Sequence, residues 1–413
     1  MALKGRDWAM VLCGGIILTI GMGARQSFGI FQKPIAADLQ VGRELWSFAN
    51  GLAMLLMGAA APFVGGLADR FGGARTVFGG AVLYVLGMVA IAFANNGLTL
   101  IIGNAICGIG ISAAGLGPIL GIVGRNVAPA NRTLAFGIVT AGGSFGQFAI
   151  VPVVSILERR VDNWHTTMLI VALGSAIMIP LVLGLREPLR AAASQATAKA
   201  LNWRGSLNEA FAHRGFWLLT LGFFVCGFHV AFVGLHLPAY ISDKGIGLEF
   251  LGLKLTAGEL GGWAIGLVGL FNIIGAVLWG WLGGRHQRKD MLALLYLLRA
   301  LAFAVFLVLP LSPLSVLLFS ATLGFLWLGT VPLTSGLVSF MFGPAYMSML
   351  FGIVFFSHQI GSFAGAWGGG RLFDMLGNYD AMWWISVGLG LFAALCNWPI
   401  RERPVPRLAP QPA

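Results

Sequence analysis

The chain has 413 residues, of which 58% are hydrophobic and only 10% are charged. Soluble proteins carry about 25% charged residues, so this composition excludes an ordinary soluble domain and indicates an integral membrane protein. The formal net charge of +11 does not indicate a nucleic-acid partner, because the basic residues lie in short loops between apolar runs, where they act as topology signals.

Twelve apolar runs are long enough to cross a bilayer, which takes about 20 helical residues. Open sheets cannot span hydrocarbon, so each run is predicted to be a helix and the chain an all-α membrane protein. The predicted spans are 8–31, 46–66, 76–94, 98–123, 134–157, 166–185, 216–241, 262–282, 290–309, 314–341, 348–370 and 381–400.

The distribution of Lys and Arg predicts the orientation. Most of these residues outside the spans lie in segments on the same side as the two termini, so both termini are expected in the cytoplasm, in a bacterial inner membrane. The longest loop on that side, 186–215, divides the chain into an N-terminal six-helix bundle, 1–185, and a C-terminal bundle with a short tail, 216–413.

The loop 186–215 itself reads as two parts. Residues 191–200 are rich in Ala, Ser and Thr, which is typical of a linker. Ser206 and Glu209 then have the spacing of a helix capping box, so a short helix on the inner membrane face is expected there. On the other side, the loop 242–261 is expected to cover the external entrance.

A charged turn separates the second and third spans. It reads G-G-L-A-D-R-F-G-G-A-R over residues 65–75, and its charges Asp69, Arg70 and Arg75 cannot lie in hydrocarbon. A weaker copy, G-W-L-G-G-R-H-Q-R-K, follows the eighth span at residues 280–289. Repetition at half the chain length predicts two similar halves, a common plan for secondary transporters.

This turn resembles the signature loop between helices 2 and 3 of the major facilitator superfamily. Within that superfamily the chain resembles monocarboxylate porters and their bacterial relatives, which include oxalate:formate exchangers. The matching stretches are R-Q-S-F-G-I-F at 25–31, G-I-G-I-S-A-A-G-L-G-P at 108–118, A-F-G-I-V-T-A-G-G-S-F-G at 135–146 and H-Q-I-G-S-F-A-G-A-W at 358–367.

The resemblance implies two pseudo-symmetric six-helix bundles around a central cavity lined by helices 1, 4, 7 and 10. It also implies a gate at Asp69, Arg70 and Arg75, where the acid caps a helix of the other half. Several family residues are replaced: Gln26 stands where eukaryotic porters carry a Lys, and Asn272 and Ala276 stand where they carry an Asp and an Arg. The proton-coupling residues of those porters are therefore missing at their usual positions.

Arg25 is the leading candidate for contact with substrate. A charge in the bilayer costs about 2.5–3.5 kcal/mol or more, so it needs a reason to be there. A guanidinium in a central cavity can bind a carboxylate with two parallel hydrogen bonds. The alternative is that the side chain reaches the outer surface.

Three histidines are further candidates for an anion site or for proton transfer. His358 lies near the middle of the eleventh span, and His229 and His236 lie two turns apart on one face of the seventh. The alternative for each is a neutral histidine bonded to a neighbouring helix.

Asn272 and Trp327 are possible pocket walls, with helix packing as the alternative. Arg299 lies in the middle of the ninth span, which the family places away from the cavity, so a structural or inner-gate role is expected.

No P-loop, HExxH, CxxC or suitably placed GxSxG motif occurs, so neither an enzyme nor a cofactor is expected. The prediction is a monomeric carrier of a small carboxylate. Proton symport and anion exchange both stay open; export of an amphiphilic drug and a non-transporting membrane sensor are the competing readings.

Overall fold

The structure, a computed structural model, describes residues 5–127, 129–185, 203–250, 253–343 and 347–405. Twelve helical spans in these residues are long and apolar enough to cross a membrane, as predicted. Their bounds are Trp8–Asp38, Arg43–Ala68, Gly73–Ala92, Gly97–Gly124, Ala135–Val161, Trp164–Leu185, Arg214–Asp243, Ala257–Gly283, Arg288–Val308, Pro313–Phe342, Met349–Leu376 and Asp380–Asn397.

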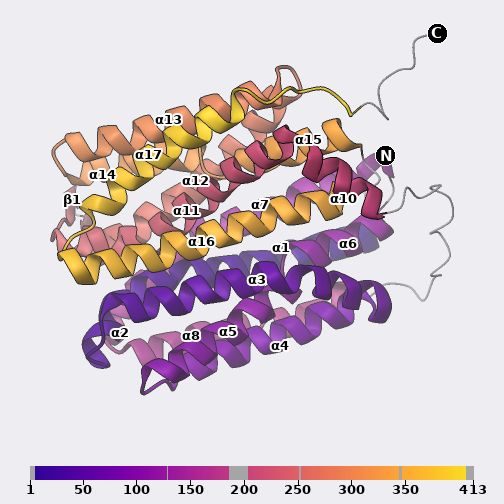
Figure 1. The fold of residues 1–413 in the computed structure, drawn as a ribbon. Coiled ribbons are helices and arrows are strands. Elements are labelled where there is room, and N and C mark those ends of the chain that lie inside the picture. Colours follow the sequence, from indigo (N-terminus) through magenta and orange to yellow (C-terminus); the bar gives the residue numbers. More distant parts are fainter. Residues whose placement is uncertain (1–4, 128, 186–202, 251–252, 344–346, 406–413) are drawn as a thin grey trace, which may run out of the picture.

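The spans form two six-helix bundles that lie side by side (Figure 1). The first contains α1 (Gly5–Gln26), η1 (Ser27–Phe31), α2 (Gln32–Asp38), α3 (Arg43–Phe71), α4 (Gly73–Ala92), α5 (Gly97–Ala113), α6 (Leu116–Asn126), α7 (Pro129–Val161), α8 (Trp164–Ser175), α9 (Met178–Leu181) and η2 (Val182–Leu185).

The second bundle contains α10 (Trp203–Ala212), α11 (Arg214–Asp243), α12 (Ala257–Gly283), α13 (Arg288–Val308), α14 (Pro313–Phe325), α15 (Thr330–Phe342), α16 (Met347–Leu376) and α17 (Asp380–Asn397). The loop 242–261 contains an antiparallel hairpin of β1 (Leu248–Phe250) and β2 (Leu253–Leu255), which was not predicted. The short helix expected after Ser206 is present as α10, whereas the linker residues 191–200 lie outside the described residues.

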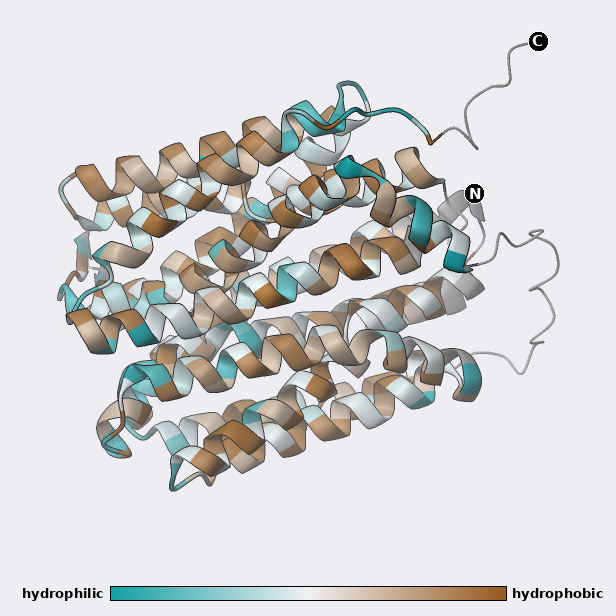
Figure 2. Ribbon diagram, in the orientation of Figure 1, coloured by the Kyte–Doolittle hydropathy of each residue, from teal (hydrophilic) through white to brown (hydrophobic). Residues whose placement is uncertain are grey.

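Each bundle has its own hydrophobic core. Trp46 and Tyr84 are fully buried in the first, and Trp327 and Trp383 are fully buried in the second. Large apolar side chains such as Leu395, which is 71% exposed, cover the outside of the bundles, while polar residues gather at the two ends (Figure 2). This pattern is that of a protein surrounded by lipid along its sides.

Two spans are broken at corresponding places. The fourth consists of α5 and α6, and the tenth of α14 and α15. In each, the second helix carries Pro as its third residue, Pro118 and Pro332. Proline lacks an N–H and is tolerated in the first turn of a helix, so a new helix can begin here where the previous one could not continue. The paired breaks are a structural trace of the predicted internal repeat.

Candidate functional site

The two bundles meet along two helix pairs, α3 with α16 and α7 with α12. We name the two ends of the molecule by the elements that Figure 1 shows there: the hairpin end carries β1 and β2, and the termini end carries α10 and the start of α1. Near the hairpin end the pairs approach closely because glycines face the partner helix. A Cβ added to Gly262 of α12 would lie 2.5 Å from the Cβ of Ser155 on α7.

The bundles separate toward the termini end. A Cβ added to Gly58 of α3 would still lie 2.6 Å from Gln359 of α16. Farther along, a Cβ added to Gly65 or Gly66 would find no atom within 4 Å, and the same holds for Gly352 on α16. The two bundles are therefore in close contact toward the hairpin end and out of contact at these three glycines toward the termini end.

Ion pairs between the bundles close the hairpin end. The first bundle contributes mainly cations and the second mainly carboxylates, which gives the contact a complementary charge. The pairs are Lys33–Asp243 at 3.0 Å, Arg43–Asp243 at 2.5 Å, Arg159–Glu259 at 2.9 Å and, with the opposite sense, Glu44–Arg371 at 2.9 Å.

Asp374 on α16 adds a helix cap to this closure. Its carboxylate accepts hydrogen bonds from the backbone N–H groups of Arg43, at 3.0 Å, and Glu44, at 2.7 Å, in the first turn of α3. An acid at a helix N-terminus is favoured by the helix dipole. A Cβ added to Gly42 would lie only 2.1 Å from an Asp374 oxygen, so the cap requires glycine there.

A buried neutral network lies just inside the ion pairs. Gln32 Nε2 donates to Ser47 Oγ and to His236 Nδ1, both at 3.0 Å. Tyr379 OH donates to Gln32 Oε1 at 3.2 Å, and His236 Nε2 donates to the carbonyl oxygen of Ala366 at 2.8 Å. This network joins the two bundles; we call it, together with the ion pairs and the Asp374 cap, the seal.

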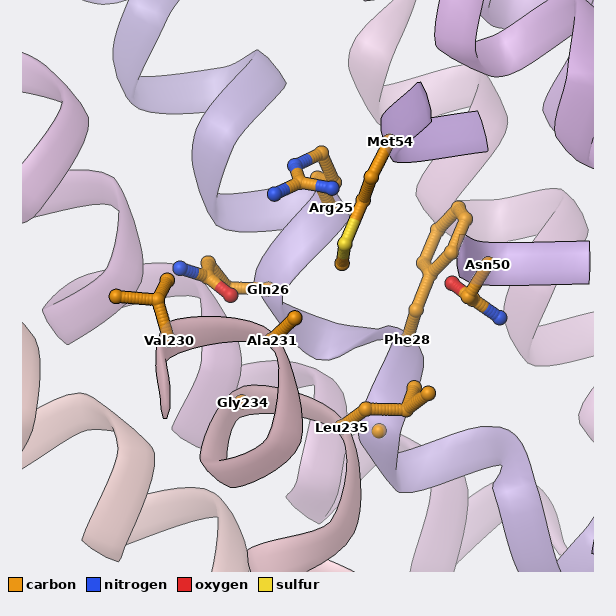
Figure 3. A pocket seen from close by; sticks show the side chains of 10 residues that line it. Arg25, Gln26, Phe28, Asn50, Met54, Val230, Ala231, Gly234 and Leu235 are labelled. Atoms are coloured by element: carbon orange, nitrogen blue, oxygen red, sulfur yellow. The ribbon is translucent and has the colours of Figure 1, made fainter. Parts of the chain in front are cut away.

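A small cavity, with room for about one water molecule and partly open to solvent, lies between the bundles next to the seal. Its walls come from α1, η1, α3 and α11, as Figure 3 shows. The lining residues are Arg25, Gln26, Phe28, Gly29, Asn50, Met54, Val230, Ala231, Gly234 and Leu235.

Arg25 is the cationic residue of this cavity. Its side chain is half-buried, and its Nε is fully buried without a hydrogen-bond partner. Within the described ranges no carboxylate oxygen lies within 4 Å of its guanidinium nitrogens. A planar cation with unused donors that faces a cavity can bind an anion, and a carboxylate matches its geometry.

Two amides frame the Arg25 side of the cavity. Asn50 on α3 donates to the carbonyl oxygen of Trp46 at 2.9 Å, which fixes its side chain. Gln26 points toward α11 in Figure 3, and its Nε2 lies 3.5 Å from Gln147 Oε1 on α7. Sequence reasoning overlooked Asn50, although a polar residue at its depth in an apolar span was a usable signal.

The structure does not bring the three candidate histidines to this cavity. His229 is fully buried, lies 2.9 Å from the carbonyl oxygen of Ser386 on α17 and packs against Phe303. His358 is 8% exposed and stacks on Phe355. His236 belongs to the seal. These placements correspond to the alternative of interhelical bonding and packing, and substrate contact by these residues remains a prediction.

Asn272, Trp327 and Arg299 meet at the break in the tenth span. Asn272 Oδ1 accepts from the backbone N–H of Leu328 at 3.0 Å, and its Nδ2 donates to Ser144 Oγ on α7 at 2.9 Å. Arg299 is fully buried and donates from Nη2 to the carbonyl oxygens of Leu326 and Trp327. Trp327 is also fully buried. Together these residues shape the break.

The predicted gate at the termini end is only partly described. The Asp69 side chain lies outside the described residues. Arg70 is exposed, with its guanidinium carbon 5.2 Å from the centroid of the Phe71 ring, and Arg75 is exposed. The gating role of this turn therefore stays a prediction.

Sequence reasoning missed the seal, although its ingredients were visible. Lys33, Arg43 and Arg159 flank spans of the first bundle on one predicted side, and Asp243, Glu259 and Asp374 flank spans of the second on the same side. A count of charge by half and by side would have indicated attraction between the halves there.

Comparisons with known proteins agree with this architecture. The family profile described as Major Facilitator Superfamily matches residues 11–366 and 255–413. Among solved structures, a bacterial homologue of the human lysosomal transporter Spinster, inward-facing and unoccupied, superposes with a TM-score of 0.77 at 14% identity, covering 98% of this chain and 100% of the other. The peptide transporter POT in complex with sulfate gives a TM-score of 0.70 at 19% identity, covering 95% and 93%.

Curated relatives are similar over most of their length. An uncharacterized MFS-type transporter, YcxA of Bacillus subtilis (strain 168), is 27% identical and covers 89% of each chain. Monocarboxylate transporter 13 of Rattus norvegicus is 26% identical over 91% of this chain and 85% of its own. With twelve membrane spans in two bundles and a family match along most of its length, the chain is a transporter, not an enzyme, and belongs to the Major Facilitator Superfamily.

Proposed function

We propose that this transporter carries a small organic anion, a monocarboxylate or a similar carboxylate, across the bacterial inner membrane by alternating access. In the proposed orientation both termini lie in the cytoplasm, so the hairpin end faces outward and the described state is open to the cytoplasm. The protein would act as a monomer in lipid, without a cofactor.

The observation that supports this cargo is the unpaired guanidinium of Arg25 in the cavity between the bundles. An ionised group removed from water without a partner is costly, and an entering carboxylate would offset that cost through two charge-assisted hydrogen bonds. Relatives named monocarboxylate transporters add support, since they are similar over most of this chain.

Uptake into proteoliposomes tests the proposal. With a panel of radiolabelled monocarboxylates of one to four carbons, Arg25→Gln should lower uptake of the preferred compound at least about tenfold, because charged hydrogen bonds are worth about 1.5–3 kcal/mol each. Arg25→Lys should retain part of the uptake, since it keeps the charge but not the planar fork.

Arg285→Gln is the matched control. Arg285 is exposed and stacks on Trp281 with its guanidinium carbon 3.7 Å from the ring centroid, away from the cavity. The organic-anion proposal is abandoned if Arg25→Gln transports these compounds as well as the Arg285 variant does.

The coupling mode has two candidates, and the fixed charge of Arg25 favours exchange. An empty carrier would have to close around an unneutralised cation, whereas a bound anion removes that barrier. Proton symport would need a titratable carrier, for which His229 and His358 are the available mid-span groups. Preloading vesicles with unlabelled substrate accelerates uptake under exchange, and an inward proton gradient accelerates it under symport.

Two further readings give different outcomes. Export of an uncharged amphiphile predicts transport that survives Arg25→Gln. A non-transporting sensor predicts that a carboxylate raises the melting temperature of the purified protein without crossing the vesicle membrane.

A further inference from the structure

His236 occupies the centre of the contact between the bundles and holds a defined protonation state there. Its Nε2 faces the carbonyl oxygen of Ala366, which can only accept, so Nε2 carries a hydrogen. Its Nδ1 faces the Nε2 amide of Gln32, which donates at 3.0 Å. Nδ1 must therefore be an unprotonated acceptor, and the closed seal requires neutral His236.

A proton on Nδ1 would remove this acceptor. Two N–H groups, one on the imidazolium and one on Gln32, would then point at each other across the boundary between the bundles. Tyr379 OH, 3.3 Å from Nδ1, is already committed: it donates to Gln32 Oε1, and its oxygen accepts from Arg43 Nη1 at 3.0 Å.

The charged surroundings do not compensate for the added positive charge. Among the charged groups of the seal on α2, α3, α11 and α16, the acids are already bonded to cations or to backbone N–H groups of α3. These groups are Lys33 of α2, Arg43 of α3, Asp243 of α11 and Asp374 of α16.

We propose that His236 is a proton-sensitive latch of the seal. His236 is fully buried when the hairpin end is closed, so water on that side reaches it only after the bundles part there. A proton taken up in the open state must leave before Gln32 can bond Nδ1 again. Acid on the hairpin side therefore shifts the carrier toward the state open on that side, whatever its cargo.

The linkage between proton binding and opening sets how strongly the open-to-closed ratio depends on pH. With an ordinary histidine pKa of about 6.5 in the open state and no protonation in the closed state, the open-to-closed ratio should rise about tenfold between pH 7.5 and pH 5.5. The rise occurs as pH falls, because only the open state binds the proton.

Labelling of a buried cysteine tests this expectation. Ala231 lines the Arg25 cavity next to the seal and is 2% exposed. Ala231→Cys is introduced after replacement of Cys13, Cys107, Cys226 and Cys396, and a membrane-impermeant maleimide is added on the hairpin side of oriented vesicles. The same measurement in the His236→Gln background supplies the reference.

The ratio of the two labelling rates cancels the pH dependence of the reagent, of the cysteine thiol and of the titratable groups other than His236. Glutamine can still donate to Ala366 and accept from Gln32, but it does not titrate. The labelling rate of the His236 protein divided by that of the His236→Gln variant should rise about tenfold from pH 7.5 to pH 5.5. A ratio constant within twofold overturns the proposal.

His165→Gln is the matched control, because His165 contacts Ala92 and Asp38, both within its own bundle. Its labelling should follow the unsubstituted His236 protein at each pH; a loss of the pH response in this variant also overturns the proposal.

Gln32→Leu keeps the test decisive if His236→Gln does not fold. It removes the donor to Nδ1, so labelling should be faster at pH 7.5 and should depend less on pH. An unchanged pH response in a Gln32→Leu protein that elutes as a single species contradicts the latch.

Discussion

Arg299 shows how a buried charge can serve the fold and not the cargo. Its Nη2 donates to two carbonyl oxygens, of Leu326 and Trp327, where α14 ends. The C-terminal end of a helix carries a partial negative charge, so the break itself offsets part of the cost of burying the cation. The sequence shows that Arg299 lies in the middle of a span, but only the fold shows that its partners are backbone carbonyl oxygens.

Replacing Arg299 with Met should destabilise the protein. Two carbonyl oxygens at the break would lose charged donors, and such bonds contribute about 1.5–3 kcal/mol each before the relief of charge burial is subtracted. We expect a lower apparent melting temperature in detergent and slower uptake. Arg285→Met, at an exposed site, should change neither, and equal melting temperatures for the two variants would contradict this role.

The break in the tenth span links the two bundles at the scale of elements. Asn272 satisfies the N–H of Leu328 in the break and, through Ser144, reaches α7 of the other bundle. None of the three groups in this chain of hydrogen bonds titrates, so the link does not depend on pH. The tenth span and α7 of the other bundle are thus tied through one side chain of α12.

Ser144→Ala should loosen the closed hairpin end without disturbing the break. It removes one hydrogen bond between the bundles, worth about 1 kcal/mol, so labelling of Ala231→Cys from the hairpin side should rise about fivefold at neutral pH. Asn272→Ala also leaves the N–H of Leu328 without its partner and should lower the melting temperature, whereas Ser144→Ala should not. Equal labelling of Ser144→Ala and the parent would exclude the tie.

At the scale of the whole molecule, closure of one end depends on how near α3 can lie to α16. Gly42 permits the Asp374 cap, because any side chain there would meet the carboxylate. Ion pairs at a surface contribute little singly, so the cap and the buried network give the seal most of its specificity.

Gly42→Ala should shift the transporter toward the state open at the hairpin end without changing any charge. Spin labels on Gln40→Cys and Glu249→Cys, which are exposed on opposite bundles, should report a longer distance. Gly79→Ala is the control, since a Cβ there meets no atom within 4 Å. The cap would lose its assigned role if both variants kept the parent distance.

The sequence predicted the parts of this molecule that local pattern determines. Apolar runs indicated twelve spans, and the isolated charge of Arg25 in the first span made it a candidate for substrate contact, which stays a prediction. The broken helices were harder to predict, because an apolar run does not reveal where its helix is interrupted. The partners in the seal, such as Arg43 with Asp243 and Asp374, are far apart in the chain and become neighbours only when the bundles dock.

The empty space beside Gly65 and Gly66, and beside Gly352 on the facing bundle, has a meaning for inhibition. Where α3 and α16 are in contact, glycines let their backbones approach closely. We therefore infer that Gly65, Gly66 and Gly352 permit the same close approach in the conformation in which the two helices meet at the termini end. A compound wedged between them from the termini end would keep the two bundles from meeting there, without resembling the cargo of the transporter.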